Sequence, residues 1–207
     1  MRTYSCTPSH FRRGVLAFRR HEKRDAMYRV ATHLVEEFWG RPRDLADAVG
    51  VLLLTWNQAL YRYGAPDFQR LERFLAKEAA TLEALRDRAI ETLTTADDDT
   101  VRLLFDDALT SLETRSNTGS RRRSPVAVAK ALHLLAPRFF PLWDAAIARA
   151  YGCSYARQPA AWYLAFMRIS REMVASFERT IRPLLGGKTP LKVLDEYNYA
   201  RFTKAWV

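Results

Sequence analysis

The chain has 207 residues, 48% of them hydrophobic, which is enough to bury a core in one domain or in two closely packed helical lobes. A formal net charge of +10 favours a polyanionic partner, because binding cations release the counterions of phosphates. Two cysteines exclude a disulfide framework and a four-cysteine zinc or iron–sulfur site, and the longest apolar run, residues 49–54, is too short to span a bilayer. We expect a cytoplasmic chain that does not enter a membrane.

Apolar residues recur at helical spacing through most of the chain, and no pair of strands is predicted. Gly64 and Pro66 end the second predicted helix, and Gly186 with Gly187 forms a turn before the last one. The predicted helices cover residues 27–38, 42–60, 68–90, 101–112, 125–135, 145–151 and 159–182, followed by a short C-terminal helix. The chain is therefore predicted to be all-α, a single compact domain over residues 1–207 with possible lobes at 25–115 and 116–207 and a cleft between them.

The polar segment 115–124, RSNTGSRRRS, interrupts the helical pattern and is predicted to be a loop. Ser124 and Pro125 have the residue types of an N-cap and of a first helical residue. A helix N-terminus attracts phosphate through its unpaired N–H groups, so this turn is predicted to bind phosphate. The residues assigned to that role are Arg121, Arg122, Arg123 and Ser124.

The alternative for this turn is a solvated loop, and the same two interpretations apply to a second basic run near the N-terminus. That run consists of Arg12, Arg13, Arg19, Arg20, Lys23 and Arg24.

Lys130 lies in the middle of the apolar stretch AVAKALHLLA, and Asp144 follows the apolar connector 139–143. Burial lowers the pKa of a lysine amine and makes it a nucleophile. Asp144 is at an N-cap position, where backbone N–H groups hold a carboxylate that can stabilise positive charge on a sugar or position water. The alternatives are a lysine whose amine extends from the surface and a simple helix cap.

A polar turn, a helix with an inward lysine, an apolar connector and a capping aspartate occur in this order over residues 116–152. This order resembles the helix-hairpin-helix DNA glycosylase superfamily. The resemblance implies that the turn holds the DNA backbone, that Lys130 attacks the sugar as a Schiff-base nucleophile and that Asp144 is the essential carboxylate. The stretch SRRRSPVAVAK has no paired glycines, so the resemblance also implies that arginines replace some backbone contacts.

A glycosylase turns its target base out of the duplex and stacks it between aromatic or apolar groups. Tryptophans suit the stacking, and side-chain amides can fill the gap in the duplex or read the edge of the base. The residues predicted to form this base pocket are Trp56, Asn57, Gln58, Tyr61, His133 and Trp143. The structural alternatives are a core position for Trp56, a hydrogen-bonded helix position for Asn57 and a satisfied structural role for His133.

The leading hypothesis is a DNA glycosylase that excises a modified or damaged base and leaves an abasic site, acting as a monomer on double-stranded DNA. It would serve base-excision repair or defence against phage DNA with modified bases. Lyase activity depends on Lys130 and is left open, as is the identity of the base. The chemistry requires neither a metal nor an organic cofactor.

Two rival hypotheses are retained. One is a non-enzymatic helical protein that binds nucleic acid, and the other is a helical module whose basic face binds an acidic protein partner.

Overall fold

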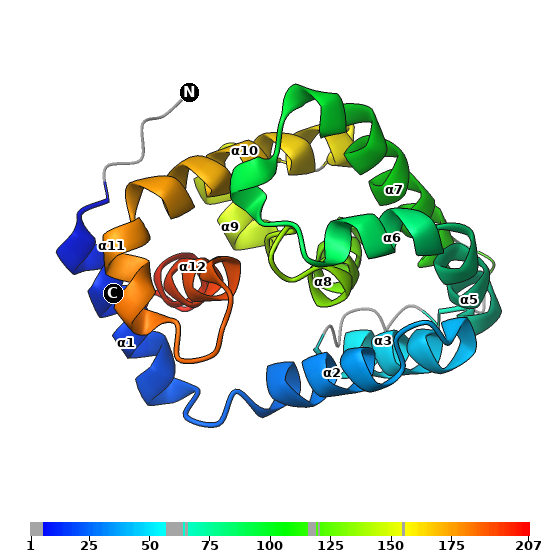
Figure 1. Cartoon of the computed structure of the whole chain (residues 1–207), viewed down its shortest axis with the longest axis horizontal. Helices are drawn as coiled ribbons and strands as arrows, with labels where there is room; N and C mark the ends of the chain where they lie inside the picture. The colour runs from blue at the N-terminus through cyan, green and yellow to red at the C-terminus, as the bar shows by residue number, and fades with distance from the viewer. Residues whose placement is uncertain (1–5, 57–63, 65, 116–118, 120, 155) are drawn as a thin grey trace.

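Helix α8 (Pro125–Leu135) lies at the centre of the molecule, and the other helices surround it (Figure 1). Eight of its eleven residues are buried, as expected for a helix that is packed on all sides. The computed structural model describes residues 6–56, 64, 66–115, 119, 121–154 and 156–207. Over these residues the fold is compact and all-α, which confirms the predicted fold class.

Most of the remaining helices follow the predicted apolar stripes, but two predicted helices are divided. The predicted helix 68–90 is divided near Glu78, and the predicted helix 159–182 is divided at Phe177. The described helices are α1 (Pro8–His21), α2 (Ala26–Glu37), α3 (Pro42–Trp56), α5 (Phe68–Lys77), α6 (Ala79–Arg86), α7 (Asp98–Ser111), α9 (Ala145–Ala150), α10 (Pro159–Ser176), α11 (Glu178–Ile181) and α12 (Pro190–Asn198). Shorter elements are the 3-10 turns η1 (Ile90–Thr92), η2 (Thr95–Asp97) and η3 (Arg182–Leu184) and the π-helix η4 (Tyr199–Thr203).

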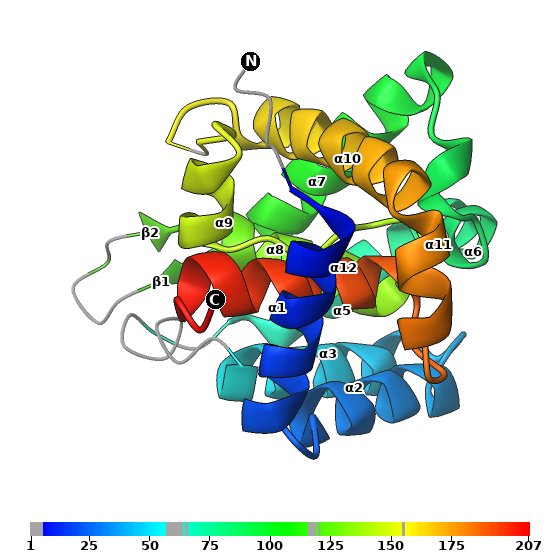
Figure 2. The same ribbon diagram turned by 90° about the vertical axis from the view of Figure 1, so that its left-hand side faces the viewer.

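Helix α1 was not among the predicted helices, although its sequence carries helical signals. Thr7 caps it by accepting a hydrogen bond from the backbone N–H of His10 at 3.3 Å, and Pro8 occupies the first turn. Phe11, Val15 and Phe18 are buried at helical spacing. This apolar stripe packs against α12, so the first and last helices of the fold are neighbours (Figure 2).

The contact between α1 and α12 requires a glycine. A Cβ atom on Gly14 would lie 2.6 Å from Cδ2 of Tyr197, so any larger residue would clash with the Tyr197 ring and force the ring or the helix to shift. The Phe11 ring stacks on the Tyr197 ring with centroids 4.8 Å apart. One continuous core of buried apolar residues runs from Phe11 to Tyr197, and the possible lobes 25–115 and 116–207 share it.

The turn between α7 and α8 contains a short antiparallel ladder, which corrects the prediction that no strands pair. Strand β1 (Thr114–Arg115) pairs with β2 (Arg121–Arg122), with Thr114 opposite Arg122. Two-residue strands are too short to produce an alternating sequence pattern, which explains why periodicity missed them. We call this turn, residues 113–124, the arginine hairpin. In the described part of the chain, no helix is both long and apolar enough to cross a bilayer.

Candidate active site

A cavity of about 280 Å³ lies where α1, α3, α8, α9 and α12 approach one another. Its walls come from segments far apart in the sequence, including the link between α1 and α2 and the connector before α9. The lining residues are Phe18, Glu22, Asp25, Ala26, Met27, Thr55, Trp56, Lys130, Leu142, Trp143, Asp144, Ile147, Lys192, Asp195 and Tyr199. The cavity thus combines two lysines and four carboxylates with aromatic walls.

Lys130 enters the cavity from the middle of α8. Its Nζ donates a hydrogen bond to the backbone oxygen of Trp56 at 2.9 Å and lies 5.2 Å from the centroid of the Trp56 ring. Burial lowers the pKa of the Lys130 amine, and the carboxylates of Asp195 and Asp144 oppose this shift only in part. The amine is therefore more readily neutral than an exposed lysine, as a nucleophile must be.

Asp144 caps α9, as predicted. Its Oδ1 accepts hydrogen bonds from the N–H groups of Ala146 and Ile147, both at 2.8 Å, and its Oδ2 accepts one from Thr203 Oγ1 at 2.6 Å. The preceding residue, Trp143, is 1% exposed, so the backbone that carries the carboxylate is anchored in the core. The carboxylate thus has a fixed orientation in the cavity that also contains Lys130.

A second lysine, Lys192 of α12, reaches the same cavity and was not predicted. Its side chain is 1% exposed, and its Nζ lies 3.0 Å from Asp195 Oδ2 and 3.7 Å from Asp25 Oδ2. Burial alone would lower the pKa of Lys192, but Asp195, Asp25 and Glu196 outweigh it and raise the pKa. The sequence did contain a signal, because Lys192 interrupts the apolar pattern of PLKVLDEYN much as Lys130 interrupts that of α8.

Asp25 extends this charge cluster across the link between α1 and α2. Its backbone has a φ of 42°, in the left-handed region, and its carboxylate accepts a hydrogen bond from Lys188 Nζ at 2.8 Å. Lys188 also donates to Glu196, which is fully buried and accepts a second bond from Arg19 Nε at 2.8 Å. These charges join α1, α12 and the α1–α2 link into one wall of the cavity.

The aromatic residues of the predicted base pocket have different positions. Trp56 and Trp143 both line the cavity, and the Trp143 ring packs on Tyr163 with centroids 5.2 Å apart. The predicted pocket residues Asn57, Gln58 and Tyr61 lie outside the described residues.

His133 does not line the cavity, which corrects its assignment to the base pocket. The ring is fully buried, with Nδ1 2.7 Å from the backbone oxygen of Phe140 and Nε2 3.2 Å from the Tyr28 hydroxyl. Burial lowers the pKa of His133 to about 3, so the imidazole is neutral. These contacts join α8 to the α8–α9 connector and to α2. The ring lies on the side of α8 that faces the core rather than Lys130.

The arginine hairpin surrounds a buried carboxylate, Glu113, whose side chain is 3% exposed. Arg123 Nε lies 3.0 Å from this carboxylate, and Arg121 Nε and an Arg70 nitrogen each lie 3.7 Å from it. Burial would raise the pKa of Glu113, but these guanidinium groups hold the pKa below its ordinary value. One carboxylate cannot neutralise three arginines, so the hairpin keeps an excess of positive charge.

The other two hairpin residues predicted to bind phosphate are Ser124 and Arg122. Ser124 caps α8, as predicted, because its Oγ accepts a hydrogen bond from the N–H of Ala127 at 3.2 Å. Arg122 is exposed on the short strand β2. The hairpin, α9 and the C-terminal end of the fold lie toward the same side of the molecule (Figure 2).

The chain matches no protein-family model, and comparisons with curated proteins and with solved structures gave no match either. The resemblance to the helix-hairpin-helix glycosylases therefore remains a prediction, without support from these comparisons. The described residues contain no group of three side chains placed to hold a metal ion.

Proposed function

We propose that the chain is a DNA glycosylase that excises a modified base from double-stranded DNA and acts as a monomer. The observation that carries this proposal is the convergence of Lys130 and Asp144, from separate elements, on one cavity with tryptophan walls. Base excision needs a pocket that accepts a flipped base, a carboxylate beside the sugar and a nucleophile, which is water or an amine.

In the proposed reaction the flipped base stacks against the indole of Trp56. The glycosidic bond between C1′ and the base nitrogen breaks, and its electron pair leaves with the base, which takes up a proton. Asp144 stabilises the positive charge that develops on the sugar. Either water or the neutral Lys130 amine then bonds to C1′, and the amine route leads to an imine and to strand cleavage.

Asp144→Asn tests the central step. Asparagine caps a helix about as well as aspartate, so the variant should fold, but it has no charge to stabilise the sugar. We expect base release to fall by about 10²-fold or more, with little change in the affinity for DNA. Full activity in this variant, measured as abasic sites formed per enzyme, would reject the proposal.

Borohydride trapping separates the two routes from the sugar cation. A covalent adduct between the chain and DNA, lost in Lys130→Met, shows that the amine forms the imine. Base release without any adduct assigns the reaction to water and leaves Lys130 with a binding role.

The identity of the base is tested by mass spectrometry of bases released from a panel of oxidised, alkylated and phage-modified DNAs. Release of one class identifies the substrate and separates repair from defence against phage. Tight, salt-dependent DNA binding with no base released from any member would favour the rival hypothesis, a non-enzymatic nucleic-acid-binding protein.

A further inference from the structure

Much of the net positive charge is concentrated near the N-terminus of the sequence. Residues 8–30 contain seven Lys or Arg and two Asp or Glu, a formal net charge of +5 out of +10 for all 207 residues. This segment is α1, the α1–α2 link and the first turns of α2. About half of the net charge is therefore carried by about one ninth of the chain.

The structure divides these charges into an inner and an outer set. Arg19 and Asp25 point inward and belong to the charge cluster of the cavity wall. The outer set, which we call the N-terminal cation cluster, comprises Arg12, Arg13, Arg20, Lys23, Arg24 and Arg29, all of them exposed. Across the described part of the chain, no carboxylate forms an ion pair with any of these six.

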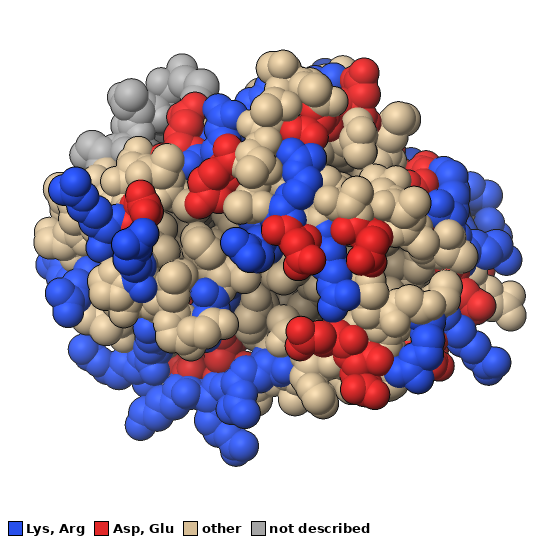
Figure 3. All heavy atoms as spheres, in the orientation of Figure 1, with Lys and Arg blue, Asp and Glu red and all other residues tan. Residues whose placement is uncertain are grey.

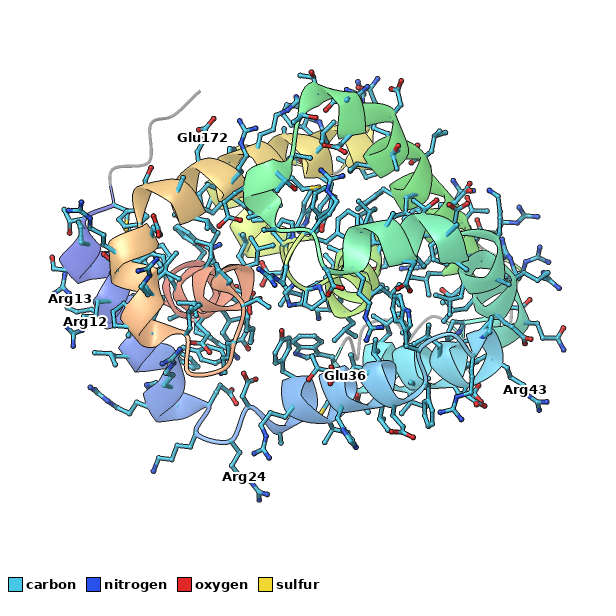
Figure 4. The ribbon with its side chains drawn as sticks, viewed as in Figure 1. Arg12, Arg13, Arg24, Glu36, Arg43 and Glu172 are labelled. Carbon is cyan, nitrogen blue, oxygen red and sulfur yellow. The ribbon has the colours of Figure 1, made fainter. Side chains whose placement is uncertain are left out.

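The cluster extends along one outer edge of the molecule. Figure 4 shows Arg12, Arg13 and Arg24 directed away from the fold, and Figure 3 shows blue side chains gathered along this edge. Arg13 and Arg20 are seven residues apart on α1 and so lie on the same face of that helix. At the opposite end of the molecule several cations are paired, as in the contacts of Lys77 with Asp107 and of Arg102 with Asp99.

The cluster adjoins the cavity. Glu22, Asp25 and Met27, which lie among its members in the sequence, line the cavity directly. Lys130 enters the same cavity from α8, the helix that begins at the arginine hairpin. The cluster therefore adjoins the cavity, and the arginine hairpin stands at the start of the helix that carries Lys130. An extended polyanion bound at the cavity would contact the cluster directly.

We propose that the N-terminal cation cluster binds the phosphate backbone of double-stranded DNA, as a second contact in addition to the arginine hairpin. This inference rests on the proposed function for its ligand, DNA with one base in the cavity. The six cations supply no sequence recognition, because phosphates are the same at every base pair. They position the strand so that the target base lies at the opening.

The test compares two triple variants that lower the net charge equally. Arg20→Gln/Lys23→Gln/Arg24→Gln removes the cluster near the cavity, and Arg43→Gln/Arg73→Gln/Arg102→Gln removes exposed arginines from α3, α5 and α7. Affinity for an unmodified duplex oligonucleotide is measured over a series of salt concentrations. Each phosphate contact contributes about 0.9 to the slope of log K against log salt, so the cluster variant should flatten the slope by about 2 to 3.

The control variant should retain most of the wild-type slope and affinity, whereas the cluster variant should bind about tenfold or more weakly at moderate salt. Equal losses in both variants would overturn the proposal, because net charge alone would then explain them. No measurable binding of the wild-type chain to the duplex would also overturn it. Base release, assayed on the same preparations, tests the glycosylase reaction separately, since the duplex used for binding contains no modified base.

Discussion

The α8 wall and the α12 wall of the cavity each present a lysine to the Trp56 ring, yet the two amines have opposite pKa shifts. Lys130 Nζ lies 5.2 Å and Lys192 Nζ 6.0 Å from the ring centroid. Lys130 has a backbone oxygen as its hydrogen-bond partner, and burial lowers its pKa. Lys192 has carboxylates as partners, and they raise its pKa despite nearly complete burial.

The difference shows that hydrogen-bond and charge partners, rather than depth alone, decide in which direction the pKa of a buried amine shifts. A backbone carbonyl offers only a dipole, which offsets part of the free-energy cost of burying a charge. A carboxylate at 3.0 Å offers a full opposite charge and makes the ion the favoured form. One wall therefore supplies a candidate nucleophile, and the other supplies an amine whose charged form is stabilised.

Lys192→Met should have the largest effect on this comparison. The substitution leaves Asp195 buried without its cation, so we expect the free energy of unfolding to fall by about 3 to 5 kcal/mol. Urea unfolding at neutral pH measures the change. A loss below about 1 kcal/mol would mean that Asp195 gives up its charge in the variant or that water reaches it.

His133 extends the comparison to a buried base with no charged hydrogen-bond partner. Its pKa is 6.5 in the unfolded chain and about 3 in the fold, so between these values only the unfolded chain binds the proton. Stability therefore falls as the pH falls through this window, by about 1.4 kcal/mol per pH unit from this group. In urea titrations the free energy of unfolding of His133→Leu should fall less steeply between pH 6.5 and pH 4 than that of the wild-type chain. An identical pH dependence would contradict the neutral, buried state of His133.

Asp195→Asn sharpens the comparison at the cavity itself. The charges that face Lys130 are Asp144, Asp195, Asp25, Glu22 and Lys192, and Asp195 makes the largest contribution that raises the pKa of Lys130. Its removal should lower that pKa further and move the pH profile of borohydride trapping to lower pH. The matched control is Asp144→Glu, which keeps a carboxylate at position 144. An unchanged pH profile in Asp195→Asn would mean that Asp195 does not influence the pKa of Lys130.

The smallest effect is expected for Lys130→Met. The substitution puts an apolar side chain of similar length in place of a partly buried amine that donates a hydrogen bond to a backbone oxygen, so the free energy of unfolding should change by less than about 1 kcal/mol. Below the ordinary lysine pKa, the unfolded chain binds the Lys130 proton more readily than the fold does, so the wild-type chain should gain stability relative to the variant as the pH rises. A fall in the free energy of unfolding as large as that of Lys192→Met would mean that the two lysines do not differ in how they are stabilised.

Local features of the sequence were sufficient to predict most of the helices and four of the residues that line the cavity, Trp56, Lys130, Trp143 and Asp144. The caps of Ser124 and Asp144 follow from residue type and position, and the apolar stripes of α2, α3, α7 and α8 follow from spacing. These signals depend only on neighbours in the chain. The same kind of signal is present in α1, in Thr7, Pro8 and the apolar stripe, although this helix was not predicted.

The α12 wall could not be predicted in this way. Asp25 and Lys188 are 163 residues apart, and nothing near either residue indicates the other. The interior position of Lys192 depends on the packing of α1 against α12, which is a property of the whole fold. For the same reason His133 was assigned to the cavity, because helical spacing from Lys130 does not show which neighbour covers the ring.

The pairing of the first helix with the last has a consequence for synthesis of the chain. The cavity takes lining residues from Phe18 to Tyr199, so it is complete only after residue 199 has left the ribosome. Until α12 emerges, the stripe of Phe11, Val15 and Phe18 lacks its main covering helix and is available to chaperones. A nascent or truncated chain can therefore expose its cations early, but it gains the cavity only once α12 is present.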